Sequence, residues 1–254
     1  SACEGYLVGE AHQGLKYMFQ MMNEARLGIG MNATAIAAAA YQTSLAYAKV
    51  RPQGRNISDK EPNRPQVPII QHADVKRMLL FQKSITEGSL ALLIFCGLLG
   101  DKLSQESEPQ KKAEMEALLD LLIPIAKSYP SEMGVQSTSM AIQVLGGAGY
   151  TTDFPVEQYY REARIHPIHE GTTGIHGLDL LGRKLLLHEG LGWKMLQKEF
   201  QHLVLFVIRM LFLYEKVLHH LLILFLFFPN FFYLLMFLKL YTLKSYSFEE
   251  PHKL

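Results

Sequence analysis

Long stretches of this chain carry a helical pattern of apolar residues, and they follow one another with short connections. The first, "GLKYMFQMMNEARLGIGMNATAIAAAAYQTSLAYAKVR", is rich in Ala, Met and Leu, which are all good helix formers. We find no alternation of strands with helices and no internal repeat. Four long amphipathic helices with short links are typical of an antiparallel bundle. The sequence therefore predicts a mainly all-α fold built on an antiparallel four-helix bundle.

Prolines and polar segments set the limits of the predicted helices. Pro52 lacks a backbone donor and restricts the residue before it, so the first helix must stop near Arg51. Residues 52–68 hold four prolines, mixed charge and no periodicity, which is typical of a long functional or disordered loop. A kink is expected at Pro124 or Pro130. The predicted helices span residues 14–51, 72–103, 111–145, 156–164 and 171–200.

Small residues on the first helix predict a close helix–helix contact. Gly28, Gly30, Ala33 and Ala37 recur at helical spacing, and small side chains let a second helix approach closely. We therefore expect this face to pack against a neighbouring helix.

The first ten or so residues form a separate feature. Tyr6, Leu7 and Val8 make a short apolar run between two glycines, which predicts one strand ending in a turn. A single strand is not stable alone, so its partner strands are expected before Ser1 or elsewhere. This segment is thus expected to belong to something larger, and the helical bundle is predicted over residues 14–200.

The last part of the chain differs in composition from the rest. From Leu203 to Leu254 there is no Ala, Gly, Asp or Gln, and Phe, Leu, Tyr, Ile and Lys dominate. Residues 221–238 carry no charge and are close to the minimum length for a membrane-spanning helix. Residues 201–254 are therefore either a membrane-anchoring tail or the product of an intron read-through, a frameshift or a misassembled gene. The bias toward residues with A- and T-rich codons favours the second interpretation.

Charge and cysteine content exclude several classes of protein. The formal net charge is +1, with 25 basic and 24 acidic residues, which argues against a nucleic-acid-binding protein with a clustered basic excess. Cys3 and Cys96 do not make a disulfide framework and fit a reducing compartment. We see no signal or transit peptide, and because the chain begins with Ser1 rather than Met, we expect its start to be absent or processed.

Glycines and histidines near the C-terminal half of the bundle give weak signals when taken alone. "QVLGGAGYT" follows a predicted helix instead of a strand, so a helix C-cap is favoured over a dinucleotide-binding loop. "HPIHEGTTGIH" places His166, His169 and His176 close together, but the order HExxH is absent and no metal site is predicted. No GxSxG motif supports a hydrolase.

Glu170 lies between a histidine and a glycine, with isoleucines close by. A carboxylate just before a helix can be an N-cap or a partner of the helix dipole. The other interpretation is a general base held in a dry pocket, and the residue alone does not decide between them.

An ordered set of motifs carries a family resemblance. "ARLGIG", "LAYAKVRPQGR", "QVLGGAGY", "PVEQYYREARI", "IHEGTTGI" and "LLGRKLL" occur in this order over roughly residues 1–198. Together they resemble the C-terminal half of the acyl-CoA dehydrogenases. Within that family they are most similar to the branch named for 3-methylmercaptopropionyl-CoA dehydrogenase.

The resemblance implies FAD-dependent dehydrogenation of an acyl-CoA thioester to a 2-enoyl-CoA. In such enzymes the glutamate at the place of Glu170 removes the α-proton, and the β-hydrogen leaves as hydride to N5 of the flavin. The backbone N–H of this glutamate and a ribityl hydroxyl of the flavin bind the thioester oxygen. Because burial disfavours a charged carboxylate, a desolvated glutamate is a stronger base than a solvated one. The resemblance thus favours a base in a dry pocket.

Further positions carry over from the motifs of the family. Arg51 stands where an arginine meets the FAD pyrophosphate across a subunit interface. Gln143, Gly146 and Gly147 match the Q-x-x-G-G motif, which contacts the FAD of the neighbouring subunit. Thr172 matches a threonine that touches the flavin nucleotide. These are the predicted cofactor-binding residues.

On the substrate side, Asn23 and Arg26 match an (Asp/Asn)-x-x-Arg pair, and Gly171 adjoins the predicted base. An ordinary helix charge is the alternative for Arg26. The chain also departs from the family pattern: His169 replaces the usual Tyr, Gly174 stands where many members have Gln, and the R-x-x-F-G motif lacks its aromatic residue near Gln53.

The resemblance also implies regions and partners that the chain does not contain. Members have an N-terminal helical domain and a middle β-domain, and the resemblance implies that residues 1–13 are the end of that β-domain. The chain is therefore expected to be a fragment of a longer protein or a product that no longer works. Expected partners are an acyl-CoA substrate, an electron-transfer flavoprotein and further copies in a homodimer or homotetramer. The cytoplasm or the mitochondrion is the expected location, with membrane association only through residues 221–238.

Other classes of function stay open from the sequence. An acyl-CoA oxidase would pass its electrons to oxygen instead. A catalytically inactive helical fragment would serve only in oligomerisation. A membrane-anchored helical protein would follow if the apolar tail is real.

Overall fold

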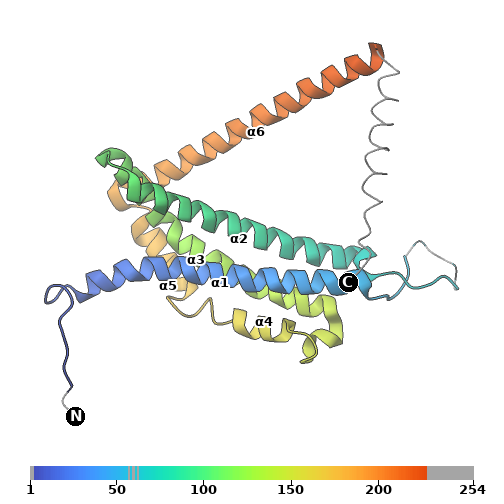
Figure 1. The fold of residues 1–254 in the computed structure, drawn as a ribbon, viewed down its shortest axis with the longest axis horizontal. Coiled ribbons are helices and arrows are strands. Elements are labelled where there is room, and N and C mark those ends of the chain that lie inside the picture. Colours follow the sequence, from blue (N-terminus) through green and yellow to red (C-terminus); the bar gives the residue numbers. More distant parts are fainter. Residues whose placement is uncertain (1–2, 57, 59–60, 62, 228–254) are drawn as a thin grey trace, which may run out of the picture. The chain divides into compact units, whose positions relative to one another are not determined.

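Three long helices dominate the structure, a computed structural model that describes residues 3–56, 58, 61 and 63–227. They are α1 (Gly14–Val50), α2 (Ala73–Gln105) and α3 (Pro109–Leu145). In Figure 1 the chain runs from left to right along α1, back along α2 and from left to right again along α3, and α3 packs against both other helices. This is the packing that the helical pattern of the sequence predicts.

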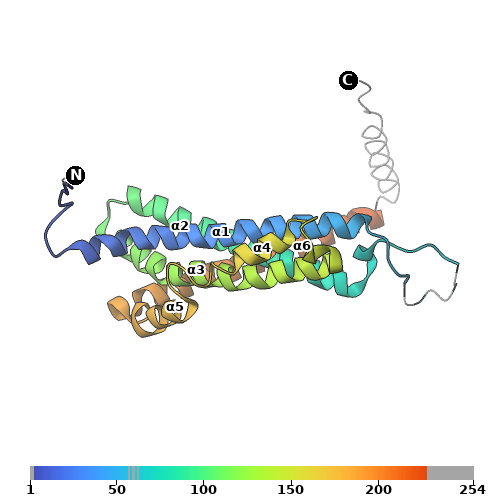
Figure 2. The same ribbon diagram turned by 90° about the horizontal axis from the view of Figure 1, so that it is seen from below.

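Shorter elements follow the third helix. Residues Val156–Ala163 form α4, which packs against α1 and α3 (Figure 2). Residues Thr173–Asp179 form α5, which also contacts α3. The remaining elements are the 3₁₀ helices η1 (Ile69–Gln71) and η2 (Gly146–Tyr150), the π-helical turn η3 (Leu180–Lys184) and α6 (Leu187–Phe227).

The sequence predicts the first four helices to within about two residues at each end. The helix predicted over residues 171–200 is wrong, because it is interrupted twice. After α5 the backbone widens into the π-helical turn, and His188, Glu189 and Gly190 then have positive φ. Left-handed residues cannot continue a right-handed helix, so the regular part of α6 begins only after Gly190.

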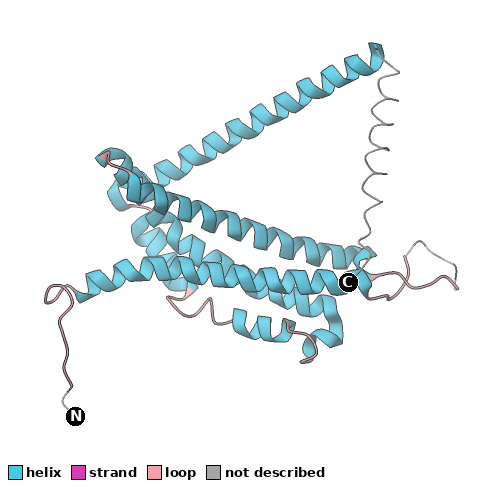
Figure 3. Ribbon diagram, in the orientation of Figure 1, coloured by secondary structure: helices cyan, strands magenta, loops and turns pink. Residues whose placement is uncertain are grey.

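The strand expected over residues 1–10 does not form in the described residues 3–10 (Figure 3). Tyr6 and Val8 are each 87% exposed, and Leu7 is exposed as well. A strand needs a neighbouring strand to accept and donate its backbone hydrogen bonds. No such partner exists in the described part of this chain.

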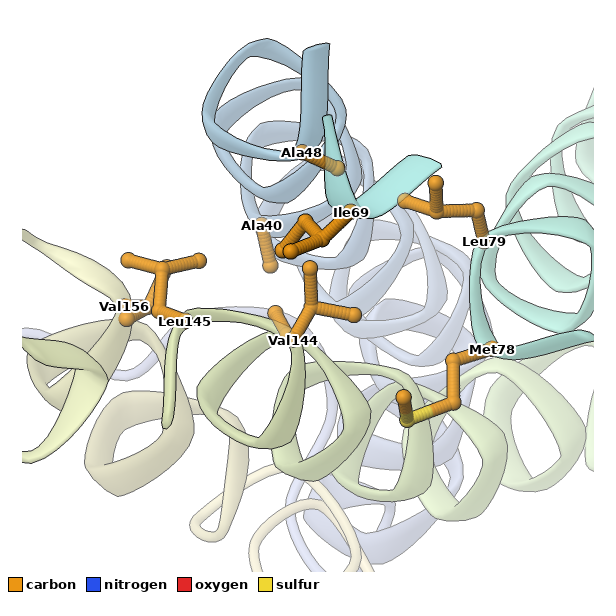
Figure 4. Close-up of a cluster of buried hydrophobic side chains, with 9 residues drawn as sticks. Ala40, Ala48, Ile69, Met78, Leu79, Val144, Leu145 and Val156 are labelled. Atoms are coloured by element: carbon orange, nitrogen blue, oxygen red, sulfur yellow. The ribbon is translucent and has the colours of Figure 1, made fainter. Parts of the chain in front are cut away.

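Two clusters of buried apolar side chains hold the helices together. One joins the C-terminal end of α1 to the start of α2, the end of α3 and the start of α4 (Figure 4): Ala40, Ala48, Ile69, Met78, Leu79, Ala141, Val144, Leu145 and Val156. The other lies between α2 and α3: Leu93, Cys96, Leu99, Leu118, Leu122 and Ala126. Met195 and Leu196 of α6 pack against the second cluster, so the first regular turns of α6 complete the bundle. Burial also raises the pKa of the Cys96 thiol to about 11.

The chain divides into two compact units, residues 1–196 and 197–254. In the second unit, the described helix exposes large apolar side chains from Phe200 to Tyr214. Most of the predicted membrane segment, residues 221–238, lies outside the described residues. In the part of the chain that was described, α2 is long and apolar enough to cross a membrane, but a helix packed inside a bundle meets the same criterion.

Close contact between α1 and α3 depends on small residues at their crossing. A methyl group built on Gly30 would collide with the backbone carbonyl of Ala126, and Ala33 packs against Gly134. Ala33 and Ala37 are buried as expected. The prediction for Gly28 is wrong, because Gly28 is exposed and a methyl group there would meet nothing within 4 Å.

These two glycines give a matched test of the helix crossing. We expect Gly30→Ala to lower the free energy of unfolding by about 1–3 kcal/mol, because α1 must move away from a backbone atom that cannot yield. Gly28→Ala should raise it by up to about 1 kcal/mol through helix propensity alone. Urea denaturation followed by circular dichroism measures both. Equal effects of the two substitutions would contradict the crossing geometry.

Candidate functional site

Four of the five predicted cofactor-binding residues come together at one cavity. Arg51, Gln143, Gly146 and Gly147 all line a space of about 780 Å³ where α1 and α3 end. Tyr47, Gln53, His72 and Met78 line it as well. Thr172 is not among its lining residues, so the structure separates this residue from the other four.

The ends of two helices build this cavity, and the sequence explains where each one stops. α1 ends at Val50, directly before Arg51 and Pro52. α3 ends at Leu145, and Gly146 continues with φ 61° and ψ −139°, a conformation available essentially to glycine alone. The C-cap predicted for these glycines is therefore confirmed. A side chain at Gly146 or Gly147 would meet nothing within 4 Å, so the backbone here faces open space.

The long loop after α1 is closed at its base next to the same cavity. The N–H of Gln53 donates to Val67 O at 3.0 Å, and the N–H of Val67 donates to Gly54 O at 3.1 Å. The His72 imidazole bonds through Nε2 to Gln53 O at 2.7 Å. Gln53 and Gly54 thus line the cavity although the family motif is shortened here.

Glu170, Gly171 and Thr172 lie on the segment that joins α4 to α5. Glu170 has φ 55° and Gly171 has φ 98°. A non-glycine residue in the left-handed region costs about 1–2 kcal/mol, and such residues concentrate at functional sites. Thr172 is the N-cap of α5, because its hydroxyl oxygen accepts from the N–H of Ile175 at 3.5 Å. The interpretation of Glu170 as an N-cap is therefore wrong.

A buried lysine holds this segment against α3. Lys127 is fully buried, and its ammonium donates to His166 O at 2.8 Å and to Gly171 O at 2.6 Å. The buried imidazole of His176 donates from Nε2 to Glu170 O at 3.1 Å, because a carbonyl oxygen can only accept. Backbone carbonyls before and after Glu170 thus accept hydrogen bonds from Lys127, and its own carbonyl accepts one from His176.

The sequence motifs did not indicate Lys127. A signal was present, since Lys127 lies four residues from Ile123 and from Ser131 on α3, and both of these are buried. A lysine in the middle of a buried helix face needs partners for its charge, so this spacing indicates that Lys127 contacts polar groups inside the protein.

Burial and nearby cations shift the titration of these groups. Burial lowers the pKa of the Lys127 ammonium, and the Arg26 guanidinium adds to this, while Glu132 and Glu170 oppose it. Burial likewise lowers the pKa of His176, helped by Arg26 and Lys127. The pKa of His166 is lowered mainly by burial. Both imidazoles are therefore neutral near pH 7.

The carboxylate of Glu170 acts on the Lys127 ammonium only through its charge. Within the described residues its carboxylate makes no hydrogen bond or ion pair, and its backbone N–H has no acceptor. The side chain is half-buried. The described part of the chain therefore fixes the backbone of this residue but does not enclose its carboxylate in a dry pocket.

The two predicted substrate residues on α1 line a second cavity of about 610 Å³. Asn23 and Arg26 share it with Ile175, in the first turn of α5, so the cavity borders the segment that follows Glu170. Arg26 is only 5% exposed and pairs with Asp179 at 3.7 Å, so it is not an ordinary solvated helix charge. Lys184, also on this cavity, bonds to Asp120 at 3.0 Å.

Arg26 and Asp179, which line this second cavity, also have polar atoms enclosed by the protein. In the part of the chain that the structure describes, Arg26 Nε and Asp179 Oδ2 are buried without hydrogen-bond partners. The ring centroids of His166 and His169 lie 5.6 Å apart, and the described residues contain no group of three His, Cys, Asp or Glu side chains arranged to hold a metal ion.

The lowered pKa values of His166 and His176 predict a fold that weakens in mild acid. Below about pH 6.5 the unfolded chain binds protons at these imidazoles, whereas the folded chain, in which their pKa values are lowered, does so only at lower pH. Proton binding therefore favours the unfolded state, and the free energy of unfolding falls as the pH falls through this range. Urea denaturation between pH 7.5 and about pH 5 should show a falling midpoint, with a smaller fall in His176→Gln. The same pH dependence in the variant would exclude His176 as a cause.

Comparisons with known proteins find similar sequences. The family model described as "Acyl-CoA dehydrogenase, C-terminal domain" matches residues 12–67 and 60–186. The 3-methylmercaptopropionyl-CoA dehydrogenase of Ruegeria pomeroyi is 45% identical over 73% of this chain and 31% of its own length. A broad-specificity linear acyl-CoA dehydrogenase of Mycobacterium tuberculosis is 34% identical over 79% of this chain and 33% of its own length.

A solved structure gives the same result for the fold. Butyryl-CoA dehydrogenase from Megasphaera elsdenii superimposes with a TM-score of 0.56 and 25% identity, over 70% of this chain and 40% of that protein. The chain spans about a third of the length of the curated relatives described above.

Proposed function

Because this chain belongs to the acyl-CoA dehydrogenase family, we propose that it forms the C-terminal helical part of an FAD-dependent enzyme that converts an acyl-CoA thioester into a 2-enoyl-CoA. The observation that carries this proposal is the state of Glu170. Its backbone is held by neighbouring groups, while its carboxylate and its N–H have no partner in the described residues. A positioned carboxylate and N–H without hydrogen-bond partners suit a ligand that can give up a proton and accept a hydrogen bond.

Glu170 would act as the general base. The α-proton of a thioester is only weakly acidic, so its removal requires a positioned base and stabilisation of the enolate oxygen. The carboxylate of Glu170 takes the α-proton, and the free N–H of the same residue donates to the thioester oxygen. The hydrogen bond from His176 to the carbonyl of Glu170 restrains the backbone of this residue, and so restrains the position of the N–H relative to the carboxylate.

The cavity where α1 and α3 end fits part of an FAD molecule by its chemistry. The Arg51 guanidinium matches a diphosphate, the Gln143 amide can donate and accept, and the glycines at positions 146 and 147 leave room for a close approach of their backbone. A volume of about 780 Å³ lies in the usual range of ligand cavities. When bound, FAD supplies the acceptor for the hydride that leaves the β-carbon.

Thr172 would contact a different part of the flavin site. It lies beside Glu170 and does not line the cavity of Arg51. This separation supports an assembly of at least two copies, in which Arg51, Gln143, Gly146 and Gly147 bind the FAD of the neighbouring subunit. The electrons would then pass to an electron-transfer flavoprotein.

The acyl-CoA itself would lie near the second cavity. Asn23 and Arg26 line that cavity next to the first turn of α5, and Gly171 directly follows the proposed base. The Arg26 guanidinium places a positive charge on this side, where it pairs with Asp179 at 3.7 Å.

Glu170→Gln tests the proposed base, and Glu189→Gln is its matched control. Both glutamates have φ 55°, but Glu189 is exposed and lies between η3 and the regular part of α6. The assay follows the visible flavin band of the purified, FAD-loaded chain after addition of an acyl-CoA series that begins with butyryl-CoA. We expect Glu170→Gln to bind the ligand yet bleach at least about 100-fold more slowly than the unsubstituted chain, and Glu189→Gln to bleach normally.

Two outcomes would contradict this function. Bleaching at the normal rate in Glu170→Gln would remove Glu170 as the base. A chain that stays colourless when FAD is added, at any chain concentration, would show that the described helices do not hold the flavin without the regions that the longer relatives contain.

A further inference from the structure

Lys127 has a position that its contribution to the bundle does not explain. Its ammonium is fully buried in the middle of α3, and no carboxylate lies within ion-pair distance in the described residues. Lys184, which is also buried, does have such a partner in Asp120. A buried charge without a counter-ion is costly, and an apolar residue of similar volume commonly stabilises a core as well or better.

Both hydrogen bonds of Lys127 go to the same short segment. The acceptors are His166 O and Gly171 O, one on each side of Glu170. A third carbonyl, that of Glu170 itself, accepts from His176. One side chain from α3 therefore ties together the two ends of the turn that carries Glu170.

The bridged turn includes the strained residue. Glu170 and Gly171 both have positive φ, and for glutamate this conformation is unfavourable in isolation. The turn also contains hydrogen bonds of its own, from the N–H groups of Ile168 and His169 to Ile165 O. Those local bonds do not involve Glu170, whose backbone is held by the bonds of Lys127 to the carbonyls on either side and by the bond of His176 to its own carbonyl.

Resting on the function proposed above, we propose that Lys127 is a positioning residue for the base: its buried ammonium, bonded to the carbonyls of His166 and Gly171, keeps the Glu170 backbone left-handed and so directs the Glu170 carboxylate and N–H toward the thioester. His176 supports it through the carbonyl of Glu170. Lys127 itself does not touch the substrate in this scheme. It acts only through the backbone of the turn.

Amide hydrogen exchange of the full chain tests this role without any need for flavin. Lys127→Met removes the donors and keeps an unbranched side chain of similar length. We expect the amides of Ile168 and His169 to exchange about tenfold faster or more, while amides in the middle of α1 and α2 keep their protection. Lys127→Gln retains an N–H donor and should accelerate exchange at these amides less. It replaces Lys127→Met in the test if that variant does not fold.

Gln82→Met is the matched control. Gln82 is also fully buried and bonds to Ser44 and to Met78 O, but it has no contact with the turn. Its loss should affect the bundle and leave exchange at Ile168 and His169 unchanged. If the turn exchanges equally in Lys127→Met and the unsubstituted chain, or if Gln82→Met accelerates it as much, the proposal is overturned.

A kinetic measurement separates positioning from general stability. In the FAD-loaded chain, Lys127→Met should slow bleaching by saturating butyryl-CoA about tenfold or more, with a change of less than about threefold in the half-saturating concentration. Changes of equal size in the bleaching rate and in the half-saturating concentration would contradict a positioning role. A colourless chain, or normal bleaching in Glu170→Gln, would defeat the proposed function alone, and the exchange data would still decide whether Lys127 holds the turn.

Discussion

The buried ammonium of Lys127 connects the bundle to the turn that carries Glu170. It takes its place in the middle of α3, and its two acceptors belong to the segment between α4 and α5. α3 in turn packs against both α1 and α2, so the position of the turn depends on the packing of the whole bundle. Apolar contacts between helices therefore position α3, and one side chain of α3 positions the turn.

The same packing also forms the other two parts of the candidate site. The cavity of Arg51 and Gln143 exists because α1 and α3 end side by side over the cluster that contains Ala48, Val144 and Leu145. The cavity of Asn23 and Arg26 lies where α5 and η3 meet α1 and α3. The three parts of the candidate site thus depend on one contact, that of α1 with α3 through small residues such as Gly30 and Ala33.

Sequence reasoning succeeded where a local rule determines the structure. Helical periodicity and Pro52 place α1, and the glycine that must adopt positive φ ends α3 at Leu145. The order of the motifs indicated the family, and the structure brings Arg51 together with Gln143, Gly146 and Gly147. The roles of these residues and of Glu170 stay predictions, because they depend on ligands and on a longer chain.

It failed where a contact distant in sequence determines the structure. Nothing local in "LLGRKLLLHEG" forbids a helix, yet the backbone widens at Leu180–Lys184 and turns left-handed at His188. The importance of Lys127 depends on carbonyls about 40 residues away. The first residues read as a strand, but strand pairing is a property of two segments, and only one is present in the described chain.

The most direct test of this account is nitrogen-15 NMR of the full chain with selectively labelled lysine side chains. Ammonium protons exposed to water exchange too quickly to be detected at neutral pH, whereas those of a buried and hydrogen-bonded ammonium are protected. Because Lys127 and Lys184 are buried and hydrogen-bonded, slowly exchanging ammonium signals are expected at pH 7, one of which disappears in Lys127→Met. If every lysine ammonium exchanges as a solvated one does, Lys127 does not hold the turn, and the geometry of Glu170 must have another cause.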